Sequence, residues 1–344
     1  MIPDAALIVA SGMATSVGLG SDASCAAMRA KLAGFVETRF TLSGEWLIGC
    51  AVPLERACLG RERQLEMLEI ALRDCLSGVP RSTLHEAPLF VALSERERAG
   101  RPEGLDVTLL GEMGRRFGLT LHPDSDVLPG GRTAGVEALE RARDAVRNGC
   151  PAAIVAGVDS YLTGSTLQDL NKRRRLLTAE NSDGFIPGEA ASAILVVPGS
   201  RSTGSELRCT GIGYGREKAV LDSEEPLRSD GLSAAFQTAL RDAQASWTDL
   251  DYQIGSMSGE QYHFREAALA ALRSIRPVKR SFDLWHPSDC IGEVGAAIVP
   301  CMLGLALASG RKGYAPGPGV LCFSADDDGR RAAVILQSQG SHFA

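Results

Sequence analysis

Apolar strand-like runs alternate with segments of helical period along this 344-residue chain, and this alternation limits what it can fold into. Apolar runs occupy residues 5–10 and 88–93, and segments of helical period occupy residues 65–76 and 104–117. Residues 152–157 form a short continuous apolar run, which is typical of a strand buried on both faces. Alternating strands and helices favour an α/β fold with a buried sheet.

A second series of strand and helix patterns begins near Leu207. The strand-like residues 207–210 lead into a Gly-rich stretch, which we expect to be a loop, and then into a helix at 232–243. The chain begins in the same way, because the strand at 5–10 is followed by an expected loop at 11–13 and a helix at 23–32. This repetition indicates a weak internal duplication.

The join between the two series lies near residues 198–205, a Pro-, Gly- and Ser-rich stretch that resembles a linker. The strand-like runs 320–323 and 332–337 close the second series. We therefore expect two related halves, residues 1–200 and residues 205–344.

Composition excludes several classes of protein. Apolar residues make up 44% of the chain and the net charge is −6, which predicts neither disorder nor a nucleic-acid-binding surface. The longest apolar stretch, 295–309, contains Pro300 and is shorter than the roughly 20 residues that cross a bilayer. The N-terminus lacks the positive region of a secretory signal, so we expect a cytoplasmic protein that does not bind membranes. Nine cysteines without a CxxC pair and five isolated histidines predict reduced thiols, no metal site and no cofactor.

Residues 183–191, with the sequence DGFIPGEAA, are the most specific motif. They resemble the DGFVxGEGA segment of the β-ketoacyl synthases, which belong to the thiolase-like superfamily. The matching positions are Asp183, Gly184, Phe185, Gly188 and Glu189. Such a segment makes a tight glycine turn, and we expect Glu189 to be a structural carboxylate because a buried charge needs partners.

Four further segments match this family in the same order, so the resemblance spans nearly the whole chain. They are residues 8–18, 137–160, 291–297 and 320–336. The resemblance implies a thiolase-like five-layered αβαβα fold of two related halves. It also implies a homodimer or heterodimer, built on the strand that precedes Gly130.

Catalysis in this family uses a nucleophilic cysteine and two further residues, usually histidines. Aligning this chain on the resemblance places Arg132, Ser258 and Asp289 at these three positions. The glycine-rich closing loop of the family is also replaced, by residues 324–329. An arginine is not a nucleophile at neutral pH, and a triad that has lost its members supplies little catalysis. The resemblance therefore implies a fold that has lost condensation.

Two side chains are weaker candidates for an unusual active site. Cys290 could replace the nucleophile and His286 could replace the base, which together with Asp289 would make an acyltransferase similar to 3-oxoacyl carrier-protein synthases. The common alternative is that both side chains only pack. His263, which begins a helix, is expected at the surface or an interface.

Two charge runs, residues 172–175 and 326–328, are expected to be solvated. The basic run has a second interpretation, because an arginine cluster can position the phosphate of a phosphopantetheine arm or an anionic carrier protein.

The preferred hypothesis is a catalytically degenerate bacterial pseudoenzyme that acts as a binding, adaptor or partner subunit. Relatives without the triad include the chain-length factors that pair with active synthases, and compact thiolase-like proteins associated with type VI secretion effectors. The short chain and residues 258–262 favour the second group. The expected partner is a carrier protein, an active synthase or a secreted effector, and the alternative hypothesis is the acyltransferase.

Overall fold

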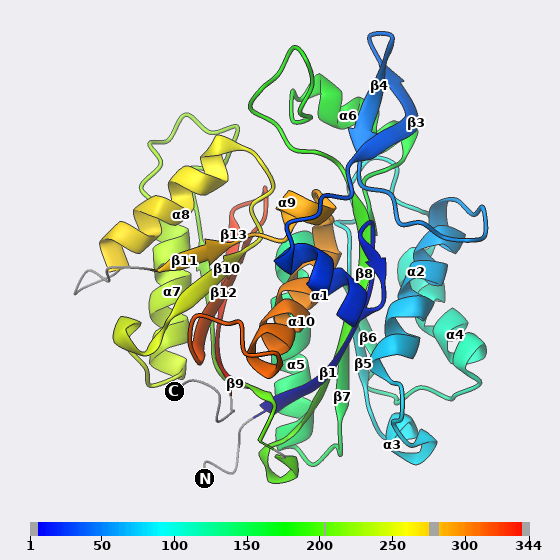
Figure 1. Cartoon of the computed structure of the whole chain (residues 1–344), viewed down its shortest axis with the longest axis vertical. Helices are drawn as coiled ribbons and strands as arrows, with labels where there is room; N and C mark the ends of the chain where they lie inside the picture. Colours follow the sequence, from blue (N-terminus) through cyan, green and yellow to red (C-terminus); the bar gives the residue numbers. More distant parts are fainter. Residues whose placement is uncertain (1–5, 203, 275–281, 339–344) are drawn as a thin grey trace.

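The computed structural model describes residues 6–202, 204–274 and 282–338 (Figure 1). Within these residues eleven strands form one mixed sheet, and ten of them follow the order β11-β10-β12-β13-β9-β1-β8-β7-β5-β6. The strands of the first half are β1 (Ala6–Thr15), β2 (Gly18–Leu19), β5 (Leu89–Leu93), β6 (Asp126–Pro129), β7 (Ala153–Ser160) and β8 (Glu189–Pro198). Those of the second half are β9 (Leu207–Arg216), β10 (Tyr252–Gly255), β11 (Asp283–Trp285), β12 (Gly319–Ala325) and β13 (Arg330–Ser338).

The strand order is the same in both halves. In the first half it is β6-β5-β7-β8-β1, and in the second it is β11-β10-β12-β13-β9. In each half the first three strands of this series are parallel, and the last two join antiparallel. The halves are linked where β1 pairs with β9, at Ala6 opposite Cys209.

Helices make three layers around the two halves of the sheet (Figure 1). Their bounds are α1 (Ser21–Arg29), α2 (Gly60–Cys75), α3 (Arg81–His85), α4 (Leu105–Phe117), α5 (Ala134–Arg147), α6 (Gly164–Lys172), α7 (Asp230–Asp242), α8 (Gln261–Ser274), α9 (Ser288–Ile291) and α10 (Ile298–Arg311). Helices α2 and α4 cover the outer face of the first half, and α7 and α8 cover the outer face of the second half. Helices α5 and α10 lie between the halves in the central core. This arrangement confirms the five-layered α/β fold.

Two glycine-rich stretches that were expected to be loops are strands instead. Strand β1 continues to Thr15, and β9 continues to Arg216. A Cβ on Gly12 would lie 2.0 Å from the carbonyl oxygen of Ala71 in α2, and one on Gly213 would lie 2.3 Å from that of Ala235 in α7. These glycines therefore let a helix backbone approach the strand, and they do not mark turns.

Short 3-10 turns precede both central helices and bring the two halves together. Turn η1 (Gly131–Thr133) leads into α5, and η4 (Gly295–Ala297) leads into α10. The two turns contact each other. A two-stranded hairpin, β3 (Val36–Leu42) and β4 (Glu45–Gly49), projects from the first half and was not predicted (Figure 1). In the part of the chain that the structure describes, we find no helix with the length and apolar character needed to span a bilayer.

Candidate functional site

Arg132 lies in η1, directly before the central helix α5, with its side chain buried. Gly131 precedes it with a φ of +69°, and a Cβ there would lie 2.1 Å from the carboxylate of Glu95, so this turn requires glycine. Arg132 Nη1 donates to Glu293 Oε2 at 2.9 Å, and Nη2 donates to Asp327. The guanidinium is therefore held by carboxylates from two different loops.

Asp326 holds the backbone of the same turn. Its Oδ1 accepts the N–H of Arg132 at 2.8 Å, and its Oδ2 accepts the N–H and hydroxyl of Thr133. Burial raises the pKa of Asp326 to about 6, against the lowering effect of Arg132. The neighbouring Asp327 behaves differently, because Arg132 and Arg175 outweigh its burial and hold its pKa well below the usual range.

Glu293 joins Arg132 to Ser258. Ser258 Oγ donates to Glu293 Oε2 at 2.6 Å, and Glu293 Oε1 accepts the N–H of Gly295 at 2.8 Å. Glu293 is buried and lies on the segment between α9 and η4. In the sequence this segment resembles a family motif, and the resemblance does not single out Glu293. The available signal was a charged residue within an otherwise small and apolar stretch.

A second buried arginine extends the network. Arg175 donates to both carboxylate oxygens of Glu260, and its Nη1 donates to Asp327 Oδ2 at 2.7 Å. Burial alone would lower the pKa of Arg175, but the bonds to Glu260 and the charge of Asp327 raise it. His263 Nε2 lies 3.8 Å from Glu260, and burial together with the charge of Arg132 lowers the pKa of this histidine, so it is neutral at pH 7.

Three expectations about these residues are wrong. His263 is buried and not at the surface, because the first turn of α8 faces the ion network. Arg175, in the basic run, and Asp326, in the acidic run, are also buried and not solvated. Arg175 and Asp326 each find an opposite charge across the site, which offsets the cost of leaving water. His263 is neutral and does not need such a partner.

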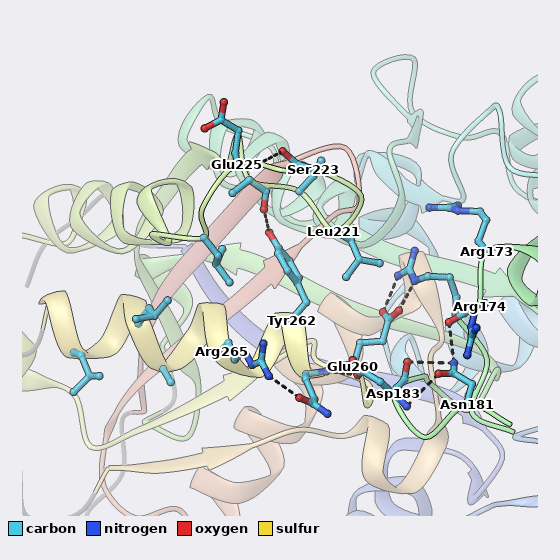
Figure 2. A pocket seen from close by; sticks show the side chains of 18 residues that line it. Arg173, Arg174, Asn181, Asp183, Leu221, Ser223, Glu225, Glu260, Tyr262 and Arg265 are labelled. Carbon is cyan, nitrogen blue, oxygen red and sulfur yellow. Dashed lines mark hydrogen bonds and ion pairs between the residues drawn. The ribbon is translucent and has the colours of Figure 1, made fainter. Parts of the chain in front are cut away.

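A hollow of about 890 Å³ lies beside this network (Figure 2). Helix α8, residues 219–227 and residues 173–183 form its walls. Glu260 and Arg175 line it, whereas Arg132 and Ser258 do not. The paired Arg175 and Glu260 thus lie between the hollow and Arg132.

The rim of this hollow is rich in arginine, from Arg173, Arg174 and Arg265 (Figure 2). Arg173 lies 3.5 Å from Asp222, and Arg265 donates to Gln261 at 2.9 Å. The structure records no side-chain partner for Arg174 among the residues that it describes. The rim therefore presents positive charge to solvent.

The remaining predicted residues lie away from Arg132. Asp289 is in α9 with its side chain 62% exposed, and its Oδ1 lies 2.8 Å from His286 Nδ1. Cys290 is buried beside it, and burial together with the charge of Asp289 raises the pKa of the thiol. The structure therefore brings Arg132 and Ser258 together through Glu293 but places Asp289 elsewhere.

The chain has no match among family models. One curated relative, the actinorhodin polyketide putative beta-ketoacyl synthase 2 of Streptomyces coelicolor, is 28% identical over 214 residues, 57% of this chain. The match spans about half (51%) of that relative.

Solved structures match over almost the whole chain. A chain from a complex of a type II polyketide acyl-carrier protein with its ketosynthase bound to the hexaketide has a TM-score of 0.81 at 13% identity, covering 98% of this chain and 100% of that one. The ishigamide ketosynthase/chain length factor gives a TM-score of 0.77 at 16% identity, covering 98% and 99%. The ketosynthase in complex with its chain length factor from Xenorhabdus doucetiae gives 0.74 at 16% identity, covering 97% and 98%. The chain has the β-ketoacyl synthase-like thiolase fold.

The motif shared with ketosynthases packs between the first half of the sheet and the ion network. Asp183 Oδ1 accepts the N–H of Gln261 at 2.8 Å, and the ring of Phe185 packs on Tyr161. Cβ atoms on Gly184 and Gly188 would each lie 2.5 Å from backbone atoms. The motif in this ketosynthase-like chain is therefore a close-packed turn.

Glu189 begins β8 and is fully buried. Its Oε1 accepts the N–H of Val52 at 3.0 Å and Arg63 Nε at 2.8 Å, and its Oε2 accepts the hydroxyl of Ser160 at 2.9 Å. These bonds tie β8 to the loop before α2 and to the end of β7. That its role is structural stays a prediction.

Proposed function

We propose that this chain is a non-condensing ketosynthase-like subunit that acts by binding other proteins. The observation that carries the proposal is the buried and paired Arg132, at the helix start where the resemblance implies the nucleophilic cysteine. A guanidinium keeps its proton at neutral pH and cannot attack a thioester. The step that loads an acyl group has no nucleophile at this position.

The thiols of the chain support the same proposal. All nine cysteines are free, and burial is the largest cause of a raised pKa at each of them. The pKa of Cys25 rises to about 11, and that of Cys50 to about 12. Because the thiolate is the nucleophile, a raised pKa leaves little of the reactive form at pH 7. The alternative acyltransferase, with Cys290, His286 and Asp289, is therefore disfavoured.

An ion network also occupies the space around Arg132. Arg132 and Arg175 share Asp327, and Glu293 and Glu260 complete their pairing. Removing one partner from such a buried network is costly, so it does not open readily for a substrate. This supports an adaptor over an acyl-binding enzyme.

Partners are proposed from an exposed strand edge and a charged rim. In the described sheet β6 is an edge strand that pairs with β5, so its other side is open to a second subunit. In two of the matching structures a ketosynthase is complexed with an acyl-carrier protein or with a chain length factor. We propose a homodimer, or a heterodimer with an active synthase, in the bacterial cytoplasm. A carrier protein facing the rim of Arg173, Arg174 and Arg265, and a type VI secretion effector, are the other partners to test.

Intact-mass spectrometry tests the loss of chemistry. We expect no acyl adduct after incubation with acyl-CoA or with acyl-carrier thioesters. A stoichiometric adduct that Cys290→Ala removes, and that Cys150→Ala leaves, would establish the acyltransferase instead. Cys150 is the matched control because it is the more exposed thiol.

Light scattering tests the assembly. We expect the mass of a dimer for the chain alone, or of a one-to-one complex when a synthase is added. A monomer at micromolar concentration that binds neither synthase, carrier protein nor effector would refute the partner role.

A further inference from the structure

A second hollow, of about 340 Å³, lies between α1, β11, α9 and α10, away from the Arg132 network. This volume falls at the lower end of the range of small-molecule pockets, about 300–1,000 Å³. Met28, Leu284, Trp285, Pro287 and Leu305 supply apolar lining. The hollow therefore has the size and the walls of a pocket for a small organic molecule.

Its aromatic wall is built from rings that hold each other in place. The ring of Trp285 stacks with that of Tyr314 at 6.2 Å and 24°, and it also contacts the ring of Tyr252 at 4.7 Å. Tyr252 is buried and its hydroxyl lies 3.1 Å from Ser309 Oγ, so the wall is anchored in the core. A preformed flat wall favours a ligand with a flat body, because little ordering is required on binding.

Two cations line the same hollow and make no ion pair with a described carboxylate. The guanidinium carbon of Arg29 lies 4.4 Å from the ring centre of Tyr314. Within the described chain, neither Arg29 nor Lys31 lies within 4.0 Å of a carboxylate oxygen. The acidic residue of the lining, Asp289, lies 2.8 Å from His286 Nδ1. The two cations are therefore available to an anionic ligand.

Tyr314 adds a further polar side chain to the residues that line the hollow. Tyr314 Oη is buried and makes no hydrogen bond to the described residues. Burial raises the pKa of Tyr314, so the hydroxyl keeps its proton and remains a donor. An unpartnered buried donor is costly, and a ligand that accepts a hydrogen bond from it would remove this cost.

We propose that this hollow binds a small organic carboxylate with an aromatic body. The body lies against Trp285 and Leu305, and the carboxylate accepts a hydrogen bond from Tyr314 Oη and faces Arg29 and Lys31. None of these residues belongs to the Arg132 network, so the inference is independent of the proposed function. Its failure would leave the partner role as it stands.

Titration calorimetry on the full chain tests this proposal with 2-naphthoate and its neutral analogue 2-naphthalenemethanol. We expect 2-naphthoate to bind at least tenfold more tightly than the alcohol, because only the carboxylate gains a charge-assisted bond. The double variant Arg29→Gln with Lys31→Gln removes this preference and leaves binding of the alcohol unchanged. Lys312→Gln is the matched control, because this nearby lysine already pairs with Asp22 at 2.6 Å.

Two further variants locate the ligand. Tyr314→Phe removes the donor and keeps the ring, so we expect 2-naphthoate to bind several-fold more weakly. Leu305→Trp fills the hollow, so binding of both probes is lost. Circular dichroism identifies a Leu305→Trp protein that has not folded, in which case Tyr314→Phe decides. Equal binding of the two probes, no binding at millimolar concentration, or an unchanged affinity in the double variant would overturn the proposal.

Discussion

The two turns that begin the central helices, η1 before α5 and η4 before α10, are held in the same way by different halves of the molecule. Asp326 follows β12 and accepts the N–H of Arg132 in η1 at 2.8 Å. Asp159 lies near the end of β7 and accepts the N–H of Ala296 in η4 at 3.0 Å. Strands β7 and β12 occupy the same place in the repeated strand order. Each half therefore supplies an aspartate that caps the turn of the other half.

The two turns differ in the residue whose N–H donates to the capping aspartate. In η4 that residue is Ala296, and Asp159 is tied to Arg98 by bonds of 2.7 and 2.8 Å. In η1 it is Arg132, whose guanidinium donates a hydrogen bond to Glu293. The capping aspartate is therefore common to both halves of the fold, whereas the residue at the turn decides which side chains the site contains.

The largest expected effect comes from breaking the charged turn with Arg132→Met. Glu293 and Asp327 would lose a shared buried cation, which should lower the free energy of unfolding by about 3–5 kcal/mol. Chemical denaturation measures this loss. The matched control is Arg141→Met on the exposed side of α5, whose ion pairs should contribute less than about 1 kcal/mol. Equal losses in the two variants would show that the network around η1 is not held by Arg132.

Glu189→Ala should have the next largest effect. Glu189 accepts a hydrogen bond from Ser160, which directly follows the capping residue Asp159. Truncation leaves the buried N–H of Val52 and the half-buried Arg63 without their acceptor, at a cost of about 2–3 kcal/mol. Differential scanning calorimetry should show a melting temperature lower by several degrees, or the protein should be insoluble.

Exposed Glu180→Ala serves as the control for this measurement. An unchanged melting temperature together with lost binding of a partner or acyl ligand would make Glu189 part of a functional site. The residues around the capping Asp159 of η4 would then have a functional role and not only a structural one.

Asp326→Asn tests how the capping aspartate of η1 makes stability depend on pH. The folded-state pKa of Asp326, about 6, lies above its ordinary value of 3.8, so the folded state binds the proton more tightly than the unfolded state. The stability contributed by this group is complete below pH ~4 and is lost as the pH rises towards ~6. The variant should lack this decline, which is worth on the order of 1–3 kcal/mol at about 1.4 kcal/mol per pKa unit.

Denaturation curves between pH 4 and pH 7 measure this change in slope. Ser223→Ala, which changes no titratable group, should leave the slope as it is. If the slope is identical in the wild type and in Asp326→Asn, the pKa of Asp326 is not raised in the folded state.

Ser258→Ala should have the smallest effect. Glu293 would keep Arg132 and the N–H of Gly295, so only one hydrogen bond of about 1 kcal/mol is lost. Thermal unfolding compared with Ser223→Ala, in a loop at the hollow of Figure 2, measures it. A loss as large as that of Arg132→Met would mean that Ser258, not Arg132, organises the network.

The fold could be predicted because its signal is local and repeated. The apolar run at 152–157 became the buried β7, and the helical period at 104–117 became α4. The glycines of β1 and β9 misled the prediction, since a glycine at a close helix contact and one in a turn look alike in sequence. The division at 198–205 stays a prediction.

The site could be predicted only in part. Arg132 and Ser258 came from the order of the motifs, and both donate a hydrogen bond to Glu293. Glu293 and Arg175 were missed, because buried charges carry no periodic signal of their own. Their burial depends on partners that the spacing of residues does not reveal.

The amino-acid sequence is sufficient to predict the alternation of strands and helices, the repeated order of the halves and the arginine where a thiol was expected. These properties depend on neighbouring residues or on residue identity. The burial of Arg132 depends on the folded chain, because its partners Glu293 and Asp327 lie 161 and 195 residues away along the sequence. A charge leaves water only when an opposite charge is in place to receive it, and that place is created when the two halves pack together.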